Sequence, residues 1–268
     1  VVLVHGSASY VRTWDGLAPL LSTRFRVIRY SRRHHWPNDA PTPDAGYSMA
    51  RHLDDLLTLM DRLELPATHL VGHSYGAFLS LLAAIRRPDR VASLVLAEPP
   101  VVPLLVGYPP QPGRLLSLLF SRPRTHLALL RFVATGLAPA SAAARRGDDR
   151  AAMTRFGRAV LGPARFAALS DDRREQIERN FFAAEFLDPA AMSPLSAAEV
   201  VAVRVPTRFV SGARSPAIFR HLTARLLELI PESDEVVIEG ATHDMPESHP
   251  AAFDAAVVGF LGRAATDG

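Results

Sequence analysis

The sequence predicts an α/β fold in which helices flank a mostly parallel sheet and a helical cap is inserted into the chain. Short apolar runs alternate with amphipathic helical stretches up to about residue 100, and this alternation returns after residue 200. Such alternation is typical of a parallel sheet covered by helices. Between the two parts, Pro, Gly and Ala interrupt several helical pieces and no strand-like run occurs. We therefore expect residues 1–100 and 201–268 to form the core and residues 101–200 to form the cap insert.

Six short apolar runs have the length and the β-branched residues of buried strands. They cover residues 1–4, 25–30, 69–72, 91–97, 207–210 and 235–238. Because the chain begins inside the first run, we expect that N-terminal strands of the fold precede residue 1 in the natural protein.

Helices are expected between these runs and after the last of them. The stretch between the second and third runs has the i, i+3, i+4 spacing of one helix face, and Ser48 is placed to cap it. The apolar positions are Leu53, Leu56, Leu57, Met60 and Leu63. A second helix over residues 77–87 ends before Pro88, and Pro250 opens a C-terminal helix that runs through Phe260.

The insert contains several segments with helical character, among them residues 114–120, 125–135 and 173–186. Its Ala- and Arg-rich middle, residues 138–150, is expected to be a flexible connection. The insert is therefore predicted to be a set of helices joined by irregular links.

The composition excludes several kinds of site. The chain has 268 residues, and its 30 basic and 27 acidic side chains give a formal net charge of +3. Every basic residue is Arg, and the chain has neither Lys nor Cys. Disulfides, thiolate zinc sites and cysteine nucleophiles are therefore excluded, as are Schiff-base lysines, a P-loop lysine and a Ser–Lys dyad. The sequence pI of about 9.8 partly reflects the high pKa of Arg. A net charge of +3 is too small to indicate nucleic-acid binding.

The sequence also argues against a membrane or metal partner. We find no charged-then-apolar leader and no apolar stretch of roughly 18 residues. No group of His, Asp and Glu has the spacing of a metal site. We therefore expect a cytoplasmic protein with no membrane partner, no nucleic-acid partner, no metal and no cofactor. The oligomeric state is not readable from the sequence.

A possible nucleophile lies between the third predicted strand and the helix that follows it. Gly72-His73-Ser74-Tyr75-Gly76 is a G-x-S-x-G motif in a strand–turn–helix setting, the nucleophile elbow. The turn lifts the Ser74 hydroxyl out of the sheet, and side chains larger than those of Gly72 and Gly76 would collide with its neighbours. The helix dipole at this N-terminus favours negative charge. The motif therefore indicates Ser74 as a nucleophile.

The first predicted strand ends in His5-Gly6-Ser7. A nucleophilic serine that attacks an acyl group needs two backbone N–H groups directed at the developing oxyanion. The amides of Ser7 and Tyr75 are the candidates, because Gly6 lets the backbone approach closely. We expect His5 itself to have a structural role.

A general base is expected late in the chain. The last predicted strand is followed by Glu239-Gly240-Ala241-Thr242-His243, which makes His243 the candidate. Its rival is His249, but this residue precedes Pro250 at a helix start, a position more consistent with capping.

The acid that orients the base is expected in an unusual place. The turn after the next-to-last predicted strand, residues 211–216, contains no carboxylate. The strand before the insert instead ends at Glu98, followed by two prolines. From the neighbouring strand Glu98 can reach His243, hold its tautomer and stabilise the imidazolium. The alternative is that Glu98 caps a helix or forms an ion pair at the entrance to the insert.

These motifs resemble those of the α/β-hydrolase fold superfamily, and the resemblance covers essentially the whole chain. A Glu after the strand that precedes the cap is a minority arrangement in that superfamily. It is similar to the arrangement of the zearalenone lactonases and of some haloalkane dehalogenases, although the latter use Asp where this chain has Ser74. The lactonase resemblance extends to residues 212–216 and 248–250. The insert lacks the Trp that this family uses in its cap, so its substrate does not carry over.

Together these features predict a serine hydrolase that cleaves a carboxylic ester or lactone of a hydrophobic small molecule through an acyl-enzyme. Candidate pocket residues in the insert are Leu104, Phe120, Phe181 and Phe182. The alternative is that these side chains form the small core of the insert. The loop at residues 32–36 could meet an anionic substrate group, although solvated loop charges are the favoured interpretation.

Other functions are open to the same set of residues. A carbon–carbon bond hydrolase and a cofactor-free haloperoxidase are alternatives within the enzymes. A ligand receptor that keeps the three residues but does not turn over its ligand is an alternative from another class.

Overall fold

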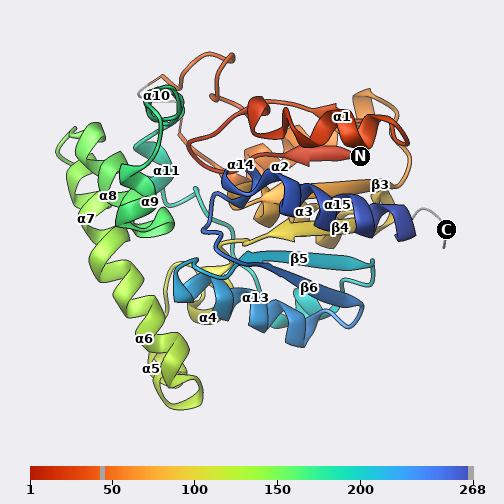
Figure 1. Ribbon diagram of the computed structural model, residues 1–268. Helices are drawn as coiled ribbons and strands as arrows, with labels where there is room; N and C mark the ends of the chain where they lie inside the picture. The colour runs from red at the N-terminus through yellow and green to blue at the C-terminus, as the bar shows by residue number, and fades with distance from the viewer. Residues whose placement is uncertain (43–45, 265–268) are drawn as a thin grey trace.

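Six parallel strands form one sheet in the computed structural model, which describes residues 1–42 and 46–264 (Figure 1). Their order in the sheet is β2-β1-β3-β4-β5-β6. The strands are β1 (Val2–Val4), β2 (Ile28–Arg29), β3 (Thr68–His73), β4 (Val91–Ala97), β5 (Thr207–Gly212) and β6 (Ser233–Ile238). The α/β fold predicted from the sequence is confirmed, and each of the six apolar runs overlaps one strand.

The centre of the sheet is buried on both faces because its side chains alternate between two apolar clusters. Along β4, Leu94 and Leu96 belong to one cluster, whereas Val95 and Ala97 belong to the other. In the middle of β3, Leu70 and Val71 separate in the same way. This burial explains why the strands read as continuous apolar runs.

Helices cover each face of the sheet (Figure 1). One cluster is shared with α2 (Met49–Arg62), α3 (Tyr75–Arg86) and α13 (Ala217–Leu229). The other is shared with η1 (Val11–Trp14), α1 (Leu17–Ser22), α14 (Met245–Ser248) and α15 (Pro250–Ala264). The short helix η2 (Pro88–Arg90) precedes β4. The prediction that Ser48 caps α2 is confirmed, because its hydroxyl accepts from the Arg51 N–H.

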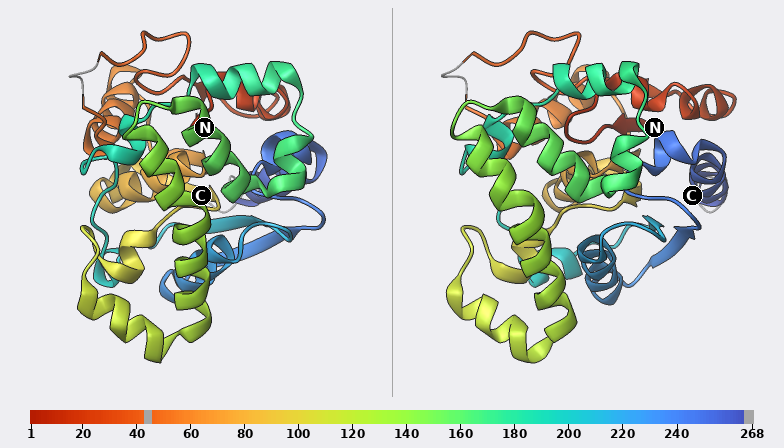
Figure 2. Two further views of the ribbon diagram at one scale, coloured as in Figure 1. Left: turned by 90° about the vertical axis from the view of Figure 1, so that its left-hand side faces the viewer. Right: turned by 60° about the vertical axis from the view of Figure 1, so that its left-hand side comes forward.

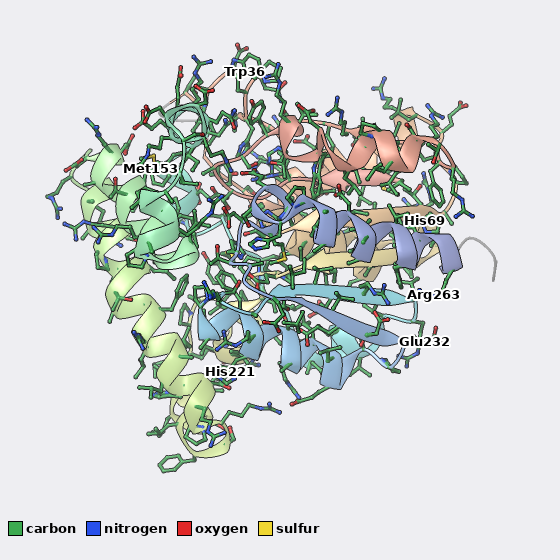
Figure 3. The ribbon with its side chains drawn as sticks, in the orientation of Figure 1. Trp36, His69, Met153, His221, Glu232 and Arg263 are labelled. Carbon is green, nitrogen blue, oxygen red and sulfur yellow. The ribbon has the colours of Figure 1, made fainter. Side chains whose placement is uncertain are left out.

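The chain between β4 and β5 is helical and lies beyond one end of the sheet. The side chains of Met153, in this segment, and Glu232 mark opposite ends of the molecule (Figure 3). The helices are α4 (Val102–Val106), α5 (Pro112–Ser121), α6 (Pro123–Phe132), η3 (Val133–Leu137), α7 (Ala138–Ala144), α8 (Asp149–Leu161), α9 (Pro163–Ala167), α10 (Asp171–Arg179), α11 (Ala184–Leu187) and α12 (Ala197–Val201). Residues 101–200, all of which the structure describes, contain no strand.

The prediction of a flexible connection at residues 138–150 is wrong. Helix α7 occupies its first half, and α8 begins at Asp149 with the Asp148 carboxylate as its N-cap. Alanine is the strongest helix former, and Ala140 and Ala143 are buried where α7 packs on α8. Only a short turn separates the two helices.

A second expectation, that no apolar stretch is long enough to span a bilayer, is also wrong. Helices α6, η3 and α7 form one continuous helix of 22 residues, Pro123–Ala144, which by length and average composition alone is apolar enough to cross a bilayer. Although Arg131 interrupts its apolar run, the surrounding Leu, Val and Ala residues keep the average high. Only 28% of its most apolar window is buried, so this helix has a large exposed apolar face.

Candidate active site

The turn between β3 and α3 holds Ser74 in a conformation that side-chain-bearing residues rarely adopt. Its φ is 52° and its ψ is −121°. A Cβ atom at Gly76 would lie 2.1 Å from the Val4 carbonyl oxygen, and one at Gly72 would lie 2.5 Å from Ala77 Cα. Glycine is therefore required at both positions, and the strained backbone holds the Ser74 hydroxyl above the end of the sheet.

The loop after β6 brings His243 to Ser74. His243 Nε2 lies 2.9 Å from Ser74 Oγ, and its Nδ1 lies 2.6 Å from Glu98 Oε2. Because the Glu98 carboxylate accepts a hydrogen bond, Nδ1 carries the proton. Nε2 is then free to accept the proton of the Ser74 hydroxyl, as a general base must.

Glu98 is fully buried at the end of β4 and has a φ of 47°. Its Oε1 accepts a hydrogen bond of 2.8 Å from the Gly212 N–H at the end of β5. A Cβ atom at Gly212 would lie 2.6 Å from the Ala241 carbonyl oxygen, so only glycine lets this turn approach the loop of His243. The turn that carries no carboxylate thus supplies the donor that orients the Glu98 carboxylate.

His249, the alternative candidate for the general base, lies at the end of a helix. His249 is at the end of α14, where its Nδ1 contacts Ser248 Oγ at 2.9 Å. His243 is held from two other sides: its carbonyl oxygen lies 2.7 Å from His73 Nε2, and its ring stacks on Phe219 at 4.2 Å. These contacts fix the imidazole that faces Ser74.

The two candidate oxyanion amides lie on either side of Ser74. Tyr75 is the first residue of α3, so its N–H has no acceptor within the helix. On the other side, a Cβ atom at Gly6 would lie 3.0 Å from Ser74 Cβ, so glycine allows the backbone before Ser7 to approach the elbow. Ser7, Ser74 and Tyr75 line one cavity, which is compatible with a joint role of the two amides.

A cavity of about 460 Å³ extends from these residues into the insert. Its walls are mostly apolar and come from α4, α6, α11 and α13. Among its lining residues are Val106, Leu129, Phe132, Phe186, Ile218 and Leu222. A smaller cavity of about 70 Å³ shares Ser7, Ser74 and His243 and reaches Arg173 and Phe181. The cavities therefore offer a large and a small compartment that meet at the serine.

Three of the four predicted pocket residues do not line either of these two cavities. In the part of the chain that the structure describes, Leu104, Phe120 and Phe182 are absent from the lining of both cavities. Phe120 points away from the fold and is 78% exposed. Leu104 and Phe182 are buried in the apolar cluster that the insert shares with the sheet, so they are core residues as the alternative proposed, but not of a separate core of the insert. Of the four, only Phe181 lines a cavity, the smaller one.

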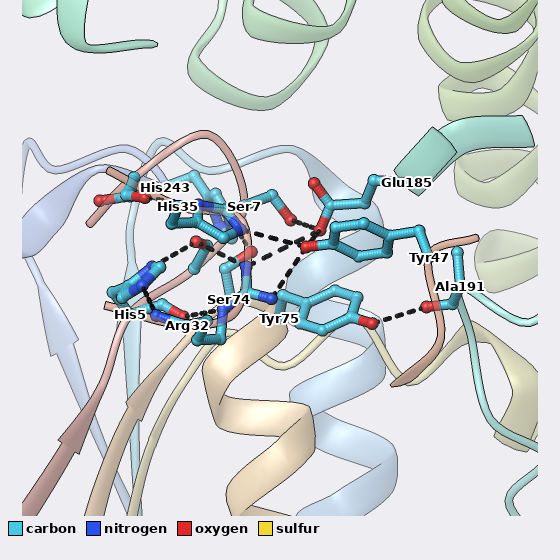
Figure 4. A network of polar contacts seen from close by, with 12 residues as sticks. His5, Ser7, Arg32, His35, Tyr47, Ser74, Tyr75, Glu185, Ala191 and His243 are labelled. Carbon is cyan, nitrogen blue, oxygen red and sulfur yellow. Dashed lines mark hydrogen bonds and ion pairs between the residues drawn. The ribbon is translucent and has the colours of Figure 1, made fainter. Parts of the chain in front are cut away.

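A buried ionic network that the sequence analysis does not predict lies directly behind the serine (Figure 4). The Arg32 guanidinium donates to the carbonyl oxygens of His5 and Gly6 at 3.1 and 3.0 Å and to the Tyr47 hydroxyl at 2.9 Å. Glu185, from α11, accepts from the Ser7 hydroxyl at 2.7 Å and lies 3.9 Å from Arg32. The carboxylate thus ties the insert to the loop that carries one candidate oxyanion amide.

The expectation of solvated charges at residues 32–36 is therefore wrong for Arg32 and His35, which are buried. Arg33 fits it, because it is exposed and pairs with Asp55. The one local signal for the network is Glu185 itself, a single carboxylate within the apolar run 181–187. The structural role expected for His5 fits its position, since Nε2 accepts the Arg32 N–H at 2.8 Å.

The buried histidines around Arg32 are neutral, mainly because burial disfavours their charged form. Burial first, and then the Arg32 charge, lower the pKa of His5 and His35 well below 6.5 and that of His52 to about 2. Burial lowers the pKa of His73 to about 3, with a further contribution from His243. Burial raises the pKa of Glu185 despite the opposing effect of Arg32.

We expect acid to destabilise the fold below about pH 6.5, because these four histidines gain protons only on unfolding. Each contributes stability above the unfolded pKa of about 6.5 and loses it, by up to about 1.4 kcal/mol per pH unit, as the pH falls. Glu185, whose folded pKa is raised, acts in the opposite direction. Urea unfolding of wild type and His52→Phe across this range measures the effect. The variant should show a shallower decline, and equal slopes would mean that His52 is protonated in the folded protein.

Comparisons with known proteins agree with the fold. The sequence matches the alpha/beta hydrolase fold family over residues 1–250. The probable oxidoreductase EphD of Mycobacterium tuberculosis is 37% identical over 113 residues, which cover 40% of this chain and 19% of that protein. The putative carbamate hydrolase RutD of Variovorax paradoxus is 37% identical over 99 residues, 37% of each chain. The matched segments thus span well under two thirds of either relative.

A solved structure is similar over nearly the full length. The enol-lactonase from Burkholderia xenovorans LB400 has a TM-score of 0.69 at 20% identity, covering 97% of this chain and 90% of that chain. At this identity the similarity establishes a shared fold.

Proposed function

The chain belongs to the alpha/beta hydrolase fold family, and on that basis we propose that it is a serine hydrolase of carboxylic esters or lactones. The observation that carries the proposal is the position of His243. One imidazole nitrogen contacts Ser74 Oγ at 2.9 Å and the other contacts the buried Glu98 carboxylate at 2.6 Å. A nucleophile, a base and an orienting acid in this order are the requirements of acyl transfer by serine.

In the proposed acylation step, Ser74 Oγ attacks the acyl carbon while His243 Nε2 takes the hydroxyl proton. The negative charge develops on the former carbonyl oxygen, where the Ser7 and Tyr75 amides stabilise it. His243 then donates the proton to the departing alkoxide oxygen, and the acyl group remains on Ser74. Glu98 stays ionised and stabilises the imidazolium.

In the deacylation step, water replaces the alcohol. His243 takes one proton from the water while the water oxygen attacks the acyl carbon. Collapse of the second tetrahedral intermediate returns this proton to Ser74 Oγ and releases the carboxylic acid. A lactone follows the same path, except that the alcohol and the acid remain in one molecule.

The apolar walls of the larger cavity support a hydrophobic substrate. Its volume of about 460 Å³ can enclose a chain of several methylenes, whereas the smaller cavity of about 70 Å³ admits only a small group. We assign the acyl part of the substrate to the larger cavity. The cytoplasmic location stays a prediction.

For p-nitrophenyl esters we expect kcat/KM to rise from acetate through butyrate to octanoate, by up to about fourfold for each methylene that enters the larger cavity. Val133→Trp, which places an indole at its wall, should lower kcat/KM for octanoate more than for acetate. A preference of the wild type for acetate would contradict the acyl assignment.

Product analysis with a lactone and a vinylogous diketone distinguishes ester hydrolysis from carbon–carbon cleavage.

A further inference from the structure

The α5–α6 hairpin carries an apolar surface that the fold leaves uncovered. We call this set of exposed residues the hairpin surface: Leu116, Leu119, Phe120, Leu127, Leu130 and Val133. Of the ten large apolar side chains that are exposed in the described part of the chain, six belong to it. The hairpin projects from the cap and away from the sheet (Figure 2). Such a cluster is unusual on a monomer and indicates a contact with another body.

Helix α6 is apolar on two of its faces. The inner face supplies Leu129 and Phe132 to the larger cavity, and Leu129 is 4% exposed. The outer face presents Leu127, which is 67% exposed. Leu130 lies between the two faces, because it is 43% exposed and also lines the cavity. Leu127 is therefore not needed to hold the helix on the cap.

The charge of this region has one sign. Residues 99–147 contain six arginines and neither Asp nor Glu. Arg114, Arg124 and Arg131 are exposed on the same two helices as the hairpin surface. The nearby Glu228 of α13 is already paired with Arg122 and with Arg225.

Helix α13, which packs beside α6, adds to the positive field. Partial burial, followed by Arg220, Arg122 and Arg124, lowers the pKa of its His221. Figure 3 shows His221 on the side of the molecule where the hairpin lies. A partner that fits this surface combines apolar material with negative charge.

We propose that the hairpin surface docks on an anionic lipid bilayer. The apolar side chains would enter the acyl region, and the long arginine side chains would reach phosphate groups at the interface. A second copy of this chain fits less well, because an isologous pairing brings each arginine-only surface against itself. This proposal replaces the expectation, drawn from the sequence, of no membrane partner.

The docked position has a consequence for substrate entry, and this consequence alone rests on the proposed function. Leu130 and Val133 are exposed on the hairpin surface and also line the larger cavity. An apolar acyl substrate dissolved in the bilayer would therefore pass from the hairpin surface toward Ser74 without crossing water. The substrate class that fits is an ester with a hydrocarbon acyl chain.

Sedimentation with vesicles tests the docking. We expect the protein to bind vesicles of equimolar phosphatidylglycerol and phosphatidylcholine, to bind phosphatidylcholine vesicles at least about tenfold more weakly, and to dissociate in high salt. Phe120→Ser/Leu127→Ser and Arg124→Gln/Arg131→Gln should each weaken binding at least about tenfold. Leu20→Ser is the matched control, since Leu20 is 50% exposed on α1, and it should bind like the wild type.

The outcomes separate docking from catalysis. Ser74→Ala should bind vesicles as tightly as the wild type, because docking needs no turnover. Equal thermal unfolding of all variants shows that lost binding is not lost folding. Absence of binding by the wild type, or an equal loss in Leu20→Ser, would overturn the proposal. Light scattering that shows a dimer broken by Phe120→Ser/Leu127→Ser, without vesicle binding, would overturn it in favour of a second copy.

Discussion

Replacing Ser74 with alanine is expected to lower kcat for a p-nitrophenyl ester by at least about 10⁴-fold. The variant keeps the cavity and both candidate oxyanion amides but loses the oxygen that His243 Nε2 contacts at 2.9 Å. The folded structure should persist, because alanine removes only one hydroxyl, at a partly buried position that faces the cavity. Steady-state kinetics with the purified variant measures the loss.

Ser80→Ala is the matched control. Ser80 lies on α3, the helix that begins directly after Ser74, and its hydroxyl donates to the Gly76 carbonyl oxygen at 2.8 Å. It should retain kcat within a few-fold of the wild type. Retention of wild-type kcat by Ser74→Ala would mean that the hydrolysis proceeds without this nucleophile.

The second large effect is expected for Glu98→Gln, which should lower kcat by about 10²- to 10⁴-fold. The Gly212 N–H selects the amide oxygen on one side, so the amide NH₂ faces His243 Nδ1. Nδ1 must then accept this hydrogen bond, and the imidazole proton moves to Nε2. In that tautomer His243 cannot take the proton of Ser74.

Separate measurement of kcat, KM and thermal unfolding shows whether Glu98 orients His243 or stabilises the fold. A loss in kcat with little change in KM, together with wild-type thermal unfolding, is the expected result. Glu247→Gln, which alters another carboxylate near the smaller cavity, should have a much smaller effect on kcat. If Glu98→Gln lowers only the unfolding temperature, Glu98 has a structural role.

Local sequence signals predict the core of the fold well. A strand buried on both faces must be apolar along its length, so the runs at β3 and β4 are visible without any knowledge of their partners. The elbow is equally local, because the close approaches at Gly72 and Gly76 leave only glycine possible. The turn at residues 211–216 contains no carboxylate, and this absence makes Glu98 the candidate for the orienting acid.

The features that the sequence does not predict depend on distant contacts. Arg32 and Glu185 are separated by 153 positions, and nothing near Arg32 indicates that its guanidinium is buried. The pocket shows the same limit. Phe120 and Phe132 are equally apolar in the sequence, but the packing of α6 on α13 directs only Phe132 inward.

The small net charge also conceals a basic region in the insert. The whole chain carries only +3, whereas the segment at residues 99–147 alone has six arginines and no carboxylate. Acidic residues elsewhere, such as Asp54 and Asp89 in surface ion pairs, offset it in the total. Only the fold shows that this basic segment also carries six of the ten large apolar side chains that are exposed among the described residues.

The most direct test of the proposed chemistry is the mass of the protein after reaction with a fluorophosphonate. We predict one covalent adduct, located by peptide mass spectrometry on Ser74, absent from Ser74→Ala and formed far more slowly in Glu98→Gln. An adduct on another residue, or hydrolysis of esters by a protein that takes up no fluorophosphonate at Ser74, would contradict the assignment of Ser74 as the nucleophile.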